Sequence, residues 1–383
     1  MSNYIPQIYL QTVRFSSVYV TSRTTWTFVE ISDREGLTEV VEISCGEDTR
    51  AVASLIEEFV VSLDGAAILD ESDVTEILGM GAYILKRHRI IATAVSALRT
   101  IVTSLQCRHK SMSIAQSLGQ NIPESVPLYA NINRSLLGNN RSPSDFARMA
   151  EKAVSQGFTT LKCAPFDEVN SVNGAVAGVE AATPGLQRIA AIRDAVGDRV
   201  NLLVDCHSRF GLDSAVHVGE ALVKWNIGWY EEPVSPMNNP DELAQVGLKV
   251  PIPIAGGESG YGKELFDSLI KDETVSIVMP DIKFCGGAAE ALRIMQSALD
   301  LGAKVSLHNP SGPVSQLGSA QVTAAITEGM LLEYAFGESE WRTNLMDPPE
   351  RIDGGRFWLP DGHGLGAGLN QKLITDIGTR WEP

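Results

Sequence analysis

From residue 126 onward, short apolar stretches alternate with longer stretches in which apolar residues recur at helical spacing. Each short stretch ends in polar residues and is followed by a loop and a helical pattern of about a dozen residues. This alternation is typical of a parallel sheet whose strands are joined by helices, an α/β fold. Eight candidate strands suggest that the sheet closes into a barrel. They are Pro127–Asn131, Thr159–Cys163, Asn201–Asp205, Gly228–Glu231, Ile252–Ala255, Ile277–Pro280, Lys304–His308 and Gly329–Tyr334.

Helix signals fit between these strands. Ser142 followed by Pro143 is typical of a helix start, with an N-cap and a proline at the first helical position. Leu186–Val196 and Gly287–Leu301 also have helical spacing. The stretch Asn170–Gly185 is different, because it is rich in small residues and has no clear period. We expect either a mobile flap beside the site or an inert insertion.

The first part of the chain has another pattern. Val18–Ile31 and Glu39–Ile43 are rich in β-branched and aromatic residues and are separated by the charged turn Asp33–Gly36, which indicates strand, turn and strand. Ala51–Leu63 and Ile84–Leu105 have apolar residues at helical spacing. We therefore expect a small antiparallel sheet covered by two or three helices.

This pattern divides the chain into three parts. Residues 1–125 are expected to form an α+β capping domain, and residues 126–345 the barrel. Residues 346–383 are rich in turn residues, and such a tail rarely adds another barrel unit. We expect it to pack back on the N-terminal segment.

Charge and cysteine content narrow the range of functions. The net charge of −16 disfavours binding to nucleic acid, and it would repel an anionic substrate unless something locally positive, such as a metal ion, received it. The start of the chain does not resemble a leader, and no long uninterrupted apolar stretch suggests a membrane span, so we expect a cytoplasmic protein. Five scattered cysteines without a C-x-x-C pair are expected to be reduced thiols.

Acidic and imidazole side chains recur at the predicted strand ends. In a parallel barrel the active site lies at the carboxyl ends of the strands, so residues suited to catalysis should recur once per strand and helix unit. Six residues follow one another at intervals of 26, 27, 23, 27 and 25 residues. They are Asp205, Glu231, Glu258, Asp281, His308 and Glu333.

The first three of these residues suggest a metal site. Asp205, Glu231 and Glu258 would converge from neighbouring strands, where three carboxylates repel one another unless a cation is present. Hard oxygen ligands with open positions suit Mg²⁺. Any one of them alone would more often be a solvated acid or an ion-pair partner. Glu232 follows Glu231 directly and should point the other way on a strand, which makes it a poorer ligand candidate.

Proton-transfer candidates lie beside this predicted metal site. Asp281 and His308 end adjacent strands, so the carboxylate could hold the imidazole and make it a general base. A lone histidine on a strand is more often part of the core. His207 lies two residues after Asp205 and could be a second proton carrier, or a rim histidine. Lys162 ends the second strand and could neutralise a substrate carboxylate or transfer a proton, unless it is a surface lysine.

At this point the chain resembles the mandelate racemase branch of the enolase superfamily. The resemblance covers essentially the whole chain; each motif is weak alone, and the ordered set is highly specific. The matching stretches are Val204-Asp205, Trp229-Tyr230-Glu231-Glu232-Pro233, Ala255-Gly256-Gly257-Glu258, Met279-Pro280-Asp281, Cys285-Gly286-Gly287, Ser306-Leu307-His308-Asn309-Pro310, Leu332-Glu333 and Gly364-Leu365-Gly366.

The resemblance implies a (β/α)7β TIM-like barrel under an α+β capping domain built from the N-terminal segment and the C-terminal tail. It also implies that the three carboxylates hold Mg²⁺, that the His308 and Asp281 dyad is a base, and that Glu333 hydrogen-bonds the substrate carboxylate. Members of this branch usually carry Lys-x-Lys on the second strand. Here the sequence is Lys162-Cys163-Ala164, which puts a two-base racemase in doubt.

The sequence Asp205-Cys206-His207 matches the Asp-x-His of sugar-acid dehydratases similar to galactonate and mannonate dehydratases. The resemblance therefore favours dehydration of an aldonate or aldarate to a 2-keto-3-deoxy acid. His308 would take the C2 proton, Mg²⁺ and Lys162 would stabilise the enediolate, and His207 would protonate the departing 3-hydroxyl.

Two asparagines and the capping loop are further candidates, and the reaction has alternatives. Asn131 and Asn133 are candidates for binding substrate hydroxyls, although they could simply cap a loop, and the capping loop near Phe15–Arg23 is a candidate for specificity. A cycloisomerase or epimerase using the same enediolate, with Lys162 as second acid or base, is the alternative enzyme. A non-catalytic barrel scaffold is a remote alternative, and the family resemblance favours a homo-oligomer.

Overall fold

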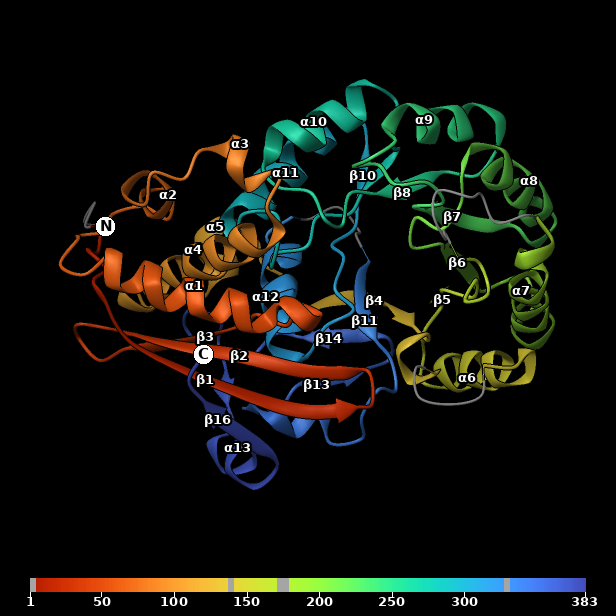
Figure 1. Ribbon diagram of the computed structural model, residues 1–383. Helices are drawn as coiled ribbons and strands as arrows, with labels where there is room; N and C mark the ends of the chain where they lie inside the picture. Colours follow the sequence, from red (N-terminus) through yellow and green to blue (C-terminus); the bar gives the residue numbers. More distant parts are fainter. Residues whose placement is uncertain (1–4, 137–140, 171–178, 327–330) are drawn as a thin grey trace.

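The computed structural model describes residues 5–136, 141–170, 179–326 and 331–383. The N-terminal part is an antiparallel sheet in the order β16-β1-β2-β3, which lies beside the barrel in Figure 1. Residues Phe15 and Val29 are opposite each other in the long β1-β2 hairpin, and Phe15 also stacks on Trp381 of β16. The strands are β1 (Leu10–Thr21), β2 (Thr24–Asp33), β3 (Thr38–Glu42) and β16 (Gly378–Trp381).

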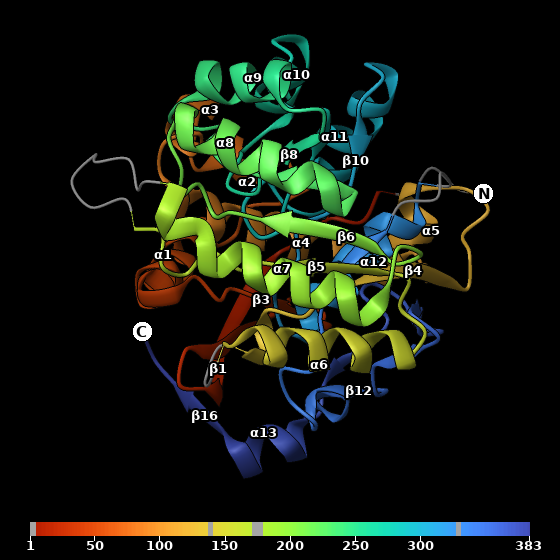
Figure 2. The same cartoon turned by 90° about the vertical axis from the view of Figure 1, so that its right-hand side faces the viewer.

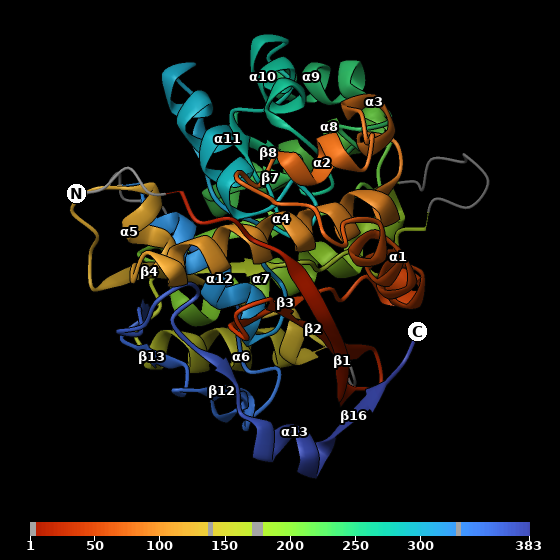
Figure 3. The same cartoon turned by 90° about the vertical axis from the view of Figure 1, so that its left-hand side faces the viewer.

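Helices cover one face of this sheet, as the turned view in Figure 3 shows for α1 and α4. Their apolar faces share one buried core with the sheet, and helix α4 is buried along most of its length. By length and composition α4 could cross a membrane, but 83% of its apolar window is buried inside the protein, as in a core helix. The helices are α1 (Thr49–Ser62), α2 (Asp73–Ile77), α3 (Ala82–Leu85), α4 (Arg89–His109) and α5 (Ile114–Leu118), with a short 3-10 turn, η1 (Gly46–Asp48).

The barrel consists of eight parallel strands in the order β11-β4-β5-β6-β7-β8-β9-β10. Its first strand, β4, follows α5, and each later strand follows one helix of the barrel. The strands are β4 (Ser125–Asn131), β5 (Thr160–Cys163), β6 (Asn201–Asp205), β7 (Ile227–Glu231), β8 (Ile254–Gly256), β9 (Ile277–Val278), β10 (Lys304–Val305) and β11 (Leu332–Ala335). The helices that join them are α6 (Pro143–Ser155), α7 (Thr183–Val196), α8 (Leu212–Leu222), α9 (Pro240–Lys249), α10 (Lys263–Lys271), α11 (Ala288–Asp300) and α12 (Pro313–Ala324).

The joining helices lie outside the strands (Figure 2). Between β10 and β11 the described residues form no backbone ladder, but the Ser306 hydroxyl donates to the Leu331 carbonyl at 2.8 Å. A small apolar core fills the barrel interior, with Tyr129 and Trp229 packed edge to face. The fold class is the α/β barrel with a capping domain that the sequence predicts.

The C-terminal tail contacts both parts of the molecule. Strand β16 pairs with β1 of the capping sheet, whereas β14 pairs antiparallel with the first half of β4. The boundaries at residues 125 and 345 stay predictions. The tail contains η5 (Arg342–Leu345), β12 (Met346–Asp347), β13 (Arg351–Asp353), β14 (Arg356–Trp358), β15 (Gly368–Leu369) and α13 (Gln371–Ile377).

Several element boundaries differ from the sequence expectations. The predicted strand Val18–Ile31 is two strands, because the chain turns between Thr21 and Thr24 and β1 begins earlier, at Leu10. Helix α7 begins at Thr183, inside the expected insertion, of which residues 171–178 lie outside the described residues. The predicted helix from Ile84 is a short turn of helix followed by α4 from Arg89. The first residues of the predicted strand Gly329–Tyr334 also lie outside the described residues.

The helix start at Ser142 is confirmed. Its side chain accepts from the Asp145 amide, and Asp145 accepts in return from the Ser142 amide, so both ends of this capping box are formed. The five cysteines are free.

Candidate active site

The predicted site residues gather at the carboxyl ends of the barrel strands. Asn131, Asp205 and Glu231 are the last residues of β4, β6 and β7, and Lys162 is the next to last residue of β5. Glu333 was expected to end its strand. It is instead the second residue of β11, so it lies deeper in the barrel.

The remaining predicted residues follow short strands. Glu258 comes two residues after β8, while Asp281 and His308 each come three residues after β9 and β10. The expectation that these side chains end their strands is wrong by a few residues. They lie on the loops just beyond, where backbone turns set their direction.

Lys162 lies at the centre of a buried cluster of charges. Its Nζ atom lies 2.8 Å from Glu231 Oε1, 2.8 Å from Glu333 Oε1 and 3.8 Å from Asp205 Oδ2. Burial disfavours the ammonium form, but the carboxylates outweigh it, so the pKa of Lys162 is well above its usual range. The surface-lysine alternative is excluded, because Lys162 is 1% exposed.

Glu231 is held in place by two donors. Lys162 donates to one oxygen, and the indole Nε1 of Trp229 donates to the other at 2.9 Å. Burial raises the pKa of Glu231 to about 8; the repulsion of Asp205 and other carboxylates adds to this effect, and the charge of Lys162 opposes it. Trp229 was not predicted as a site residue, because the strand pattern alone marks it as core.

His207 contacts Asp205 from a turn after β6, and not from a continuing strand as the alternation predicted. Strand β6 ends at Asp205, and His207 adopts a left-handed backbone with φ of 49°. The backbone amide of His207 donates to Asp205 Oδ1 at 2.9 Å, and its Nε2 lies 3.1 Å from Oδ2. The charge of Asp205 raises the pKa of His207 to about 9. The side chain stays 45% exposed, so it can meet a ligand.

His308 is held between two carboxylates. Its Nδ1 lies 2.9 Å from Asp281 Oδ2, and its Nε2 lies 3.1 Å from Glu258 Oε2. Burial lowers the pKa of His308, but the charge of Glu258 and the hydrogen bond to Asp281 raise it well above its usual value. The pairing of Asp281 with His308 is therefore present in the structure.

Asp281 has a second partner, Lys283, which the sequence reasoning missed. The Lys283 amide donates to Asp281 Oδ1 at 2.9 Å, and Nζ lies 3.8 Å from Oδ2. Burial opposes ionisation of Asp281, but the charge of Lys283 and the contact with His308 lower its pKa. The signal was available, since Lys283 stands two residues after a predicted strand-end acid.

The three predicted metal ligands have the right chemistry for Mg²⁺. Burial and the charges of Asp205 and Glu258 raise the pKa of Glu231. At Glu258 burial is outweighed by the charge and the hydrogen bond of His308, which lower its pKa. As the side chains stand, however, no three His, Cys, Asp or Glu groups within the described residues lie together as a metal-binding set. Each of the three carboxylates instead contacts a lysine or histidine. Carboxylates that lie close together and need a positive partner are suited to a divalent cation, which would replace these lysine and histidine contacts.

Glu232 points to a different place from Glu231. Its φ is 39°, and its carboxylate accepts from the Gly257 amide at 2.8 Å and the Ser208 hydroxyl at 3.1 Å. Burial, reinforced by the charge of Glu258, raises the pKa of Glu232 to about 7. This carboxylate therefore hydrogen-bonds the loop that leads to Glu258.

The two candidate asparagines differ in their surroundings. Asn131 donates from Nδ2 to Glu333 Oε1 at 2.7 Å and accepts from the Asn133 amide at 3.0 Å. The backbone amide of Asn309 donates to the other oxygen of Glu333 at 2.8 Å. The side-chain oxygen of Asn133 is buried and has no hydrogen-bond partner. Of the two asparagines, Asn133 therefore has a side-chain oxygen that could accept a hydrogen bond from a ligand.

A cavity of about 610 Å³ lies between the capping sheet and this end of the barrel. His308 and Lys283 line it on the barrel side, and the β1-β2 turn with Trp26 lines it on the capping side. The cavity is large enough for a small-molecule ligand. The expected specificity loop Phe15–Arg23 contributes through its end, since Tyr19 and the residues around Arg23 border the cavity.

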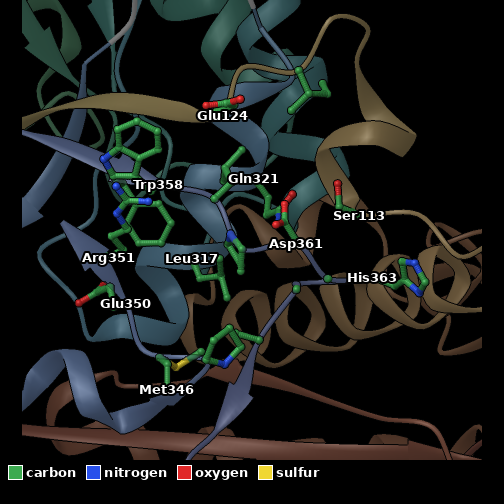
Figure 4. Close-up of a pocket in the computed structure, with 18 of the residues that line it drawn as sticks. Ser113, Glu124, Leu317, Gln321, Met346, Glu350, Arg351, Trp358, Asp361 and His363 are labelled. Atoms are coloured by element: carbon green, nitrogen blue, oxygen red, sulfur yellow. The ribbon is translucent and has the colours of Figure 1, made fainter. Parts of the chain in front are cut away.

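A larger cavity, of about 950 Å³, lies elsewhere. It is formed by the C-terminal tail with α5 and α12, and Glu124, Trp358 and His363 are among its lining residues (Figure 4). None of the predicted site residues lines it. It also adjoins β14, which pairs with the starting half of β4, whereas the charged cluster lies at the strand ends.

Comparisons with known proteins identify the family. Residues 145–373 match the family model described as enolase C-terminal domain-like. D-gluconate/D-galactonate dehydratase from Picrophilus torridus is 29% identical over 300 residues, covering 77% of this chain and 74% of that protein. D-galactarolactone cycloisomerase from Agrobacterium fabrum is 28% identical over 293 residues, covering 74% of each chain.

Among solved structures, a mandelate racemase/muconate lactonizing enzyme from Sulfitobacter sp. superposes with a TM-score of 0.87. It is 22% identical, and the match covers 97% of this chain and 95% of that one, so the likeness supports the fold. The family match spans more than half of the chain and confirms the resemblance drawn from the sequence motifs. The chain therefore belongs to the enolase C-terminal domain-like family, within the enolase superfamily.

Proposed function

We propose that the protein is a Mg²⁺-dependent hydro-lyase that dehydrates a sugar acid to a 2-keto-3-deoxy acid. The observation that carries this proposal is the imidazole of His308, held by Asp281 on one side and facing Glu258 on the other. The named dehydratase among the relatives supports the same reaction class.

His308 is the proposed base that takes the C2 proton. Asp281 occupies Nδ1, which fixes the tautomer and leaves Nε2 as the nitrogen that faces the ligand side. In the present arrangement Glu258 keeps the imidazole protonated. Ligation of Glu258 would end that contact and lower the pKa of His308 toward neutrality, which a general base requires.

Asp205, Glu231 and Glu258 are the proposed metal ligands. Mg²⁺ bound to them would neutralise the charge that grows on the substrate carboxylate as the proton leaves. Lys162, buried between Glu231 and Glu333, would place an ammonium group beside the same charge. Asn133 is proposed to bind a substrate hydroxyl, because its side-chain oxygen has no partner. Asn131, which donates to Glu333, is also proposed to bind a substrate hydroxyl, and Glu333 is proposed to hydrogen-bond the substrate carboxylate.

His207 is the proposed acid that protonates the departing 3-hydroxyl. Asp205 keeps it protonated, and its partial exposure lets it approach a ligand from the side of β6. One relative is named as a cycloisomerase, which supports an alternative. In that alternative the same proton abstraction leads to cycloisomerisation or epimerisation. That reaction would use Lys162 as the second acid or base.

Incubation of the purified protein and Mg²⁺ with a set of aldonates and aldarates tests the proposal. We expect a 2-keto-3-deoxy acid from at least one of them, detected by a 2-keto acid assay and by mass spectrometry as loss of one water. A lactone isomer or an epimer formed without keto acid would exclude dehydration and support the cycloisomerase or epimerase.

A further inference from the structure

We infer that the substrate is a dianionic sugar acid, whose second anionic group binds to arginines on the capping side of the 610 Å³ cavity. This inference rests on the proposed function, because it assigns the first carboxylate to the catalytic cluster. It narrows the substrate class from sugar acids in general to those with a second charge at the far end, either a carboxylate or a phosphate.

Cations outnumber acids along this cavity. Besides His308, the lining contains two carboxylates, Glu42 and Glu47. The four basic residues that line it are Arg23, Arg89, Arg134 and Lys283. In a chain with a net charge of −16, a cavity with this balance is suited to an anion.

Two of the four cations have their charges engaged by the protein. Arg134 Nη2 lies 3.0 Å from Glu338 and donates to the Thr24 hydroxyl at 3.2 Å, which ties the β1-β2 turn to the barrel. Lys283 contacts Asp281 and Ser311. The Arg134 contacts join the two walls of the cavity, whereas those of Lys283 stay within the barrel side.

The other two cations, Arg23 and Arg89, form no ion pair with any described residue. Arg23 is exposed at the tip of the β1-β2 turn. Arg89 is also exposed, and its guanidinium lies 4.2 Å from the centroid of the Phe284 ring. Their charges are therefore available to a ligand that enters the cavity.

Helix stability does not account for Arg89. It is the first residue of α4, where the helix dipole disfavours a positive charge. Its guanidinium lies over the ring of Phe284, which follows Lys283 in the chain. An exposed arginine in this position beside the cavity is suited to an anionic ligand.

A neutral partner is also present on the same wall. Trp26 is 1% exposed, and its Nε1 is buried without a hydrogen-bond partner. Trp26 lines the cavity together with the arginines. An indole N–H that lacks an acceptor adds a donor suited to an anionic oxygen or a hydroxyl.

The test compares three matched substrates with the Mg²⁺-loaded protein: an aldonate, the aldarate of the same configuration, and the aldonate phosphorylated at its last carbon. We expect kcat/KM at least about tenfold higher for one of the two dianionic acids than for the aldonate, and which one it is identifies the second group. Arg23→Gln and Arg89→Gln should each reduce this preference severalfold, mainly through KM.

Arg87→Gln is the matched control, since Arg87 stacks over Tyr83 and does not line the cavity. It should leave the preference intact. An aldonate used as well as or better than both dianions would overturn the inference while the proposed function stands. The inference would also be overturned if the Arg23 and Arg89 variants lowered kcat/KM equally for all three substrates.

Direct titration of the same acids separates the two claims when no keto acid forms. Tighter binding of a dianion that is lost in Arg23→Gln and Arg89→Gln would keep this subsite and reject the dehydratase. Equal or absent binding of all three acids would overturn the subsite as well.

Discussion

Lys162 is a buried cation whose neighbours all carry negative charge. Its contacts with Glu231 and Glu333 are both 2.8 Å long, and all three side chains are at most 1% exposed. At this depth an unpaired carboxylate is costly, so the three groups depend on one another. The ammonium group of Lys162 thus compensates the buried carboxylates of Glu231 and Glu333 at the barrel mouth.

Replacement of Lys162 by Met should destabilise the protein by about 3 to 5 kcal/mol, because it leaves buried carboxylates without their cation. Urea unfolding in the absence of metal measures this effect. Lys263→Met is the control, as Lys263 forms a surface ion pair with Asp267 and its loss should change stability little. Equal unfolding midpoints for both variants would contradict the assigned role.

The two histidines should fail in different ways. His308→Asn should abolish both keto acid formation and exchange of the C2 proton with deuterated solvent, since the base is gone. His207→Asn should lower the rate of dehydration by a factor of about 100 or more. Exchange of the C2 proton should continue, because protonation of the leaving group follows proton removal.

His217→Asn provides the control, because His217 is exposed on α8 and lies on the outside of the barrel. NMR of the substrate in deuterated buffer reports exchange and dehydration in one experiment. If His207→Asn lost exchange and dehydration together, the two histidines would not have the separate roles proposed here.

Helix α4 joins the capping domain to the barrel at the element scale. The start of α11 and the turn before it donate two backbone amides to α4, from Gly286 to the Ser96 hydroxyl at 2.9 Å and from Ala288 to the Thr100 hydroxyl at 3.1 Å. Gly287 between them has φ of 91°, and a Cβ there would lie 2.9 Å from the Ser96 carbonyl oxygen. The close approach thus depends on a glycine.

Gly287→Ala should destabilise the protein more than Gly302→Ala. Both glycines have positive φ, but at Gly302 an added Cβ would meet nothing within 4 Å. The control should therefore lose about 1 to 2 kcal/mol for the left-handed conformation alone. Gly287→Ala should lose more than this amount, because the two elements must also move apart. If urea unfolding showed equal losses of unfolding free energy for the two variants, the close approach at Gly287 would not limit the packing of α4 on α11.

At the scale of the whole molecule, the repeat of strand and helix made the barrel predictable. The interval of one unit placed Asp205, Glu231 and Asp281 at one mouth before any coordinates, because parallel strands end on the same side. Local signals sufficed where they were strong, as for the capping box at Ser142.

Sequence reasoning failed where the outcome depends on contacts between distant residues. The expected strand Val18–Ile31 hid the β1-β2 turn, since β-branched residues continue through it without a Gly or Pro. His207 reaches Asp205 through a left-handed turn that alternation cannot foresee. Lys283 and Trp229 were missed for a similar reason, because their contacts with the dyad and with Glu231 depend on side-chain direction.

The proposed reaction depends on one divalent cation held by acids from three neighbouring strands. Calorimetric titration of Mg²⁺ into the metal-free protein tests it most directly, with Asp205→Asn, Glu231→Gln and Glu258→Gln as variants and Glu232→Gln as the matched control. We predict one site, whose affinity falls at least about tenfold in each of the three variants and far less in the control. Binding that is unchanged in the three variants, or lost in Glu232→Gln alone, would contradict the account.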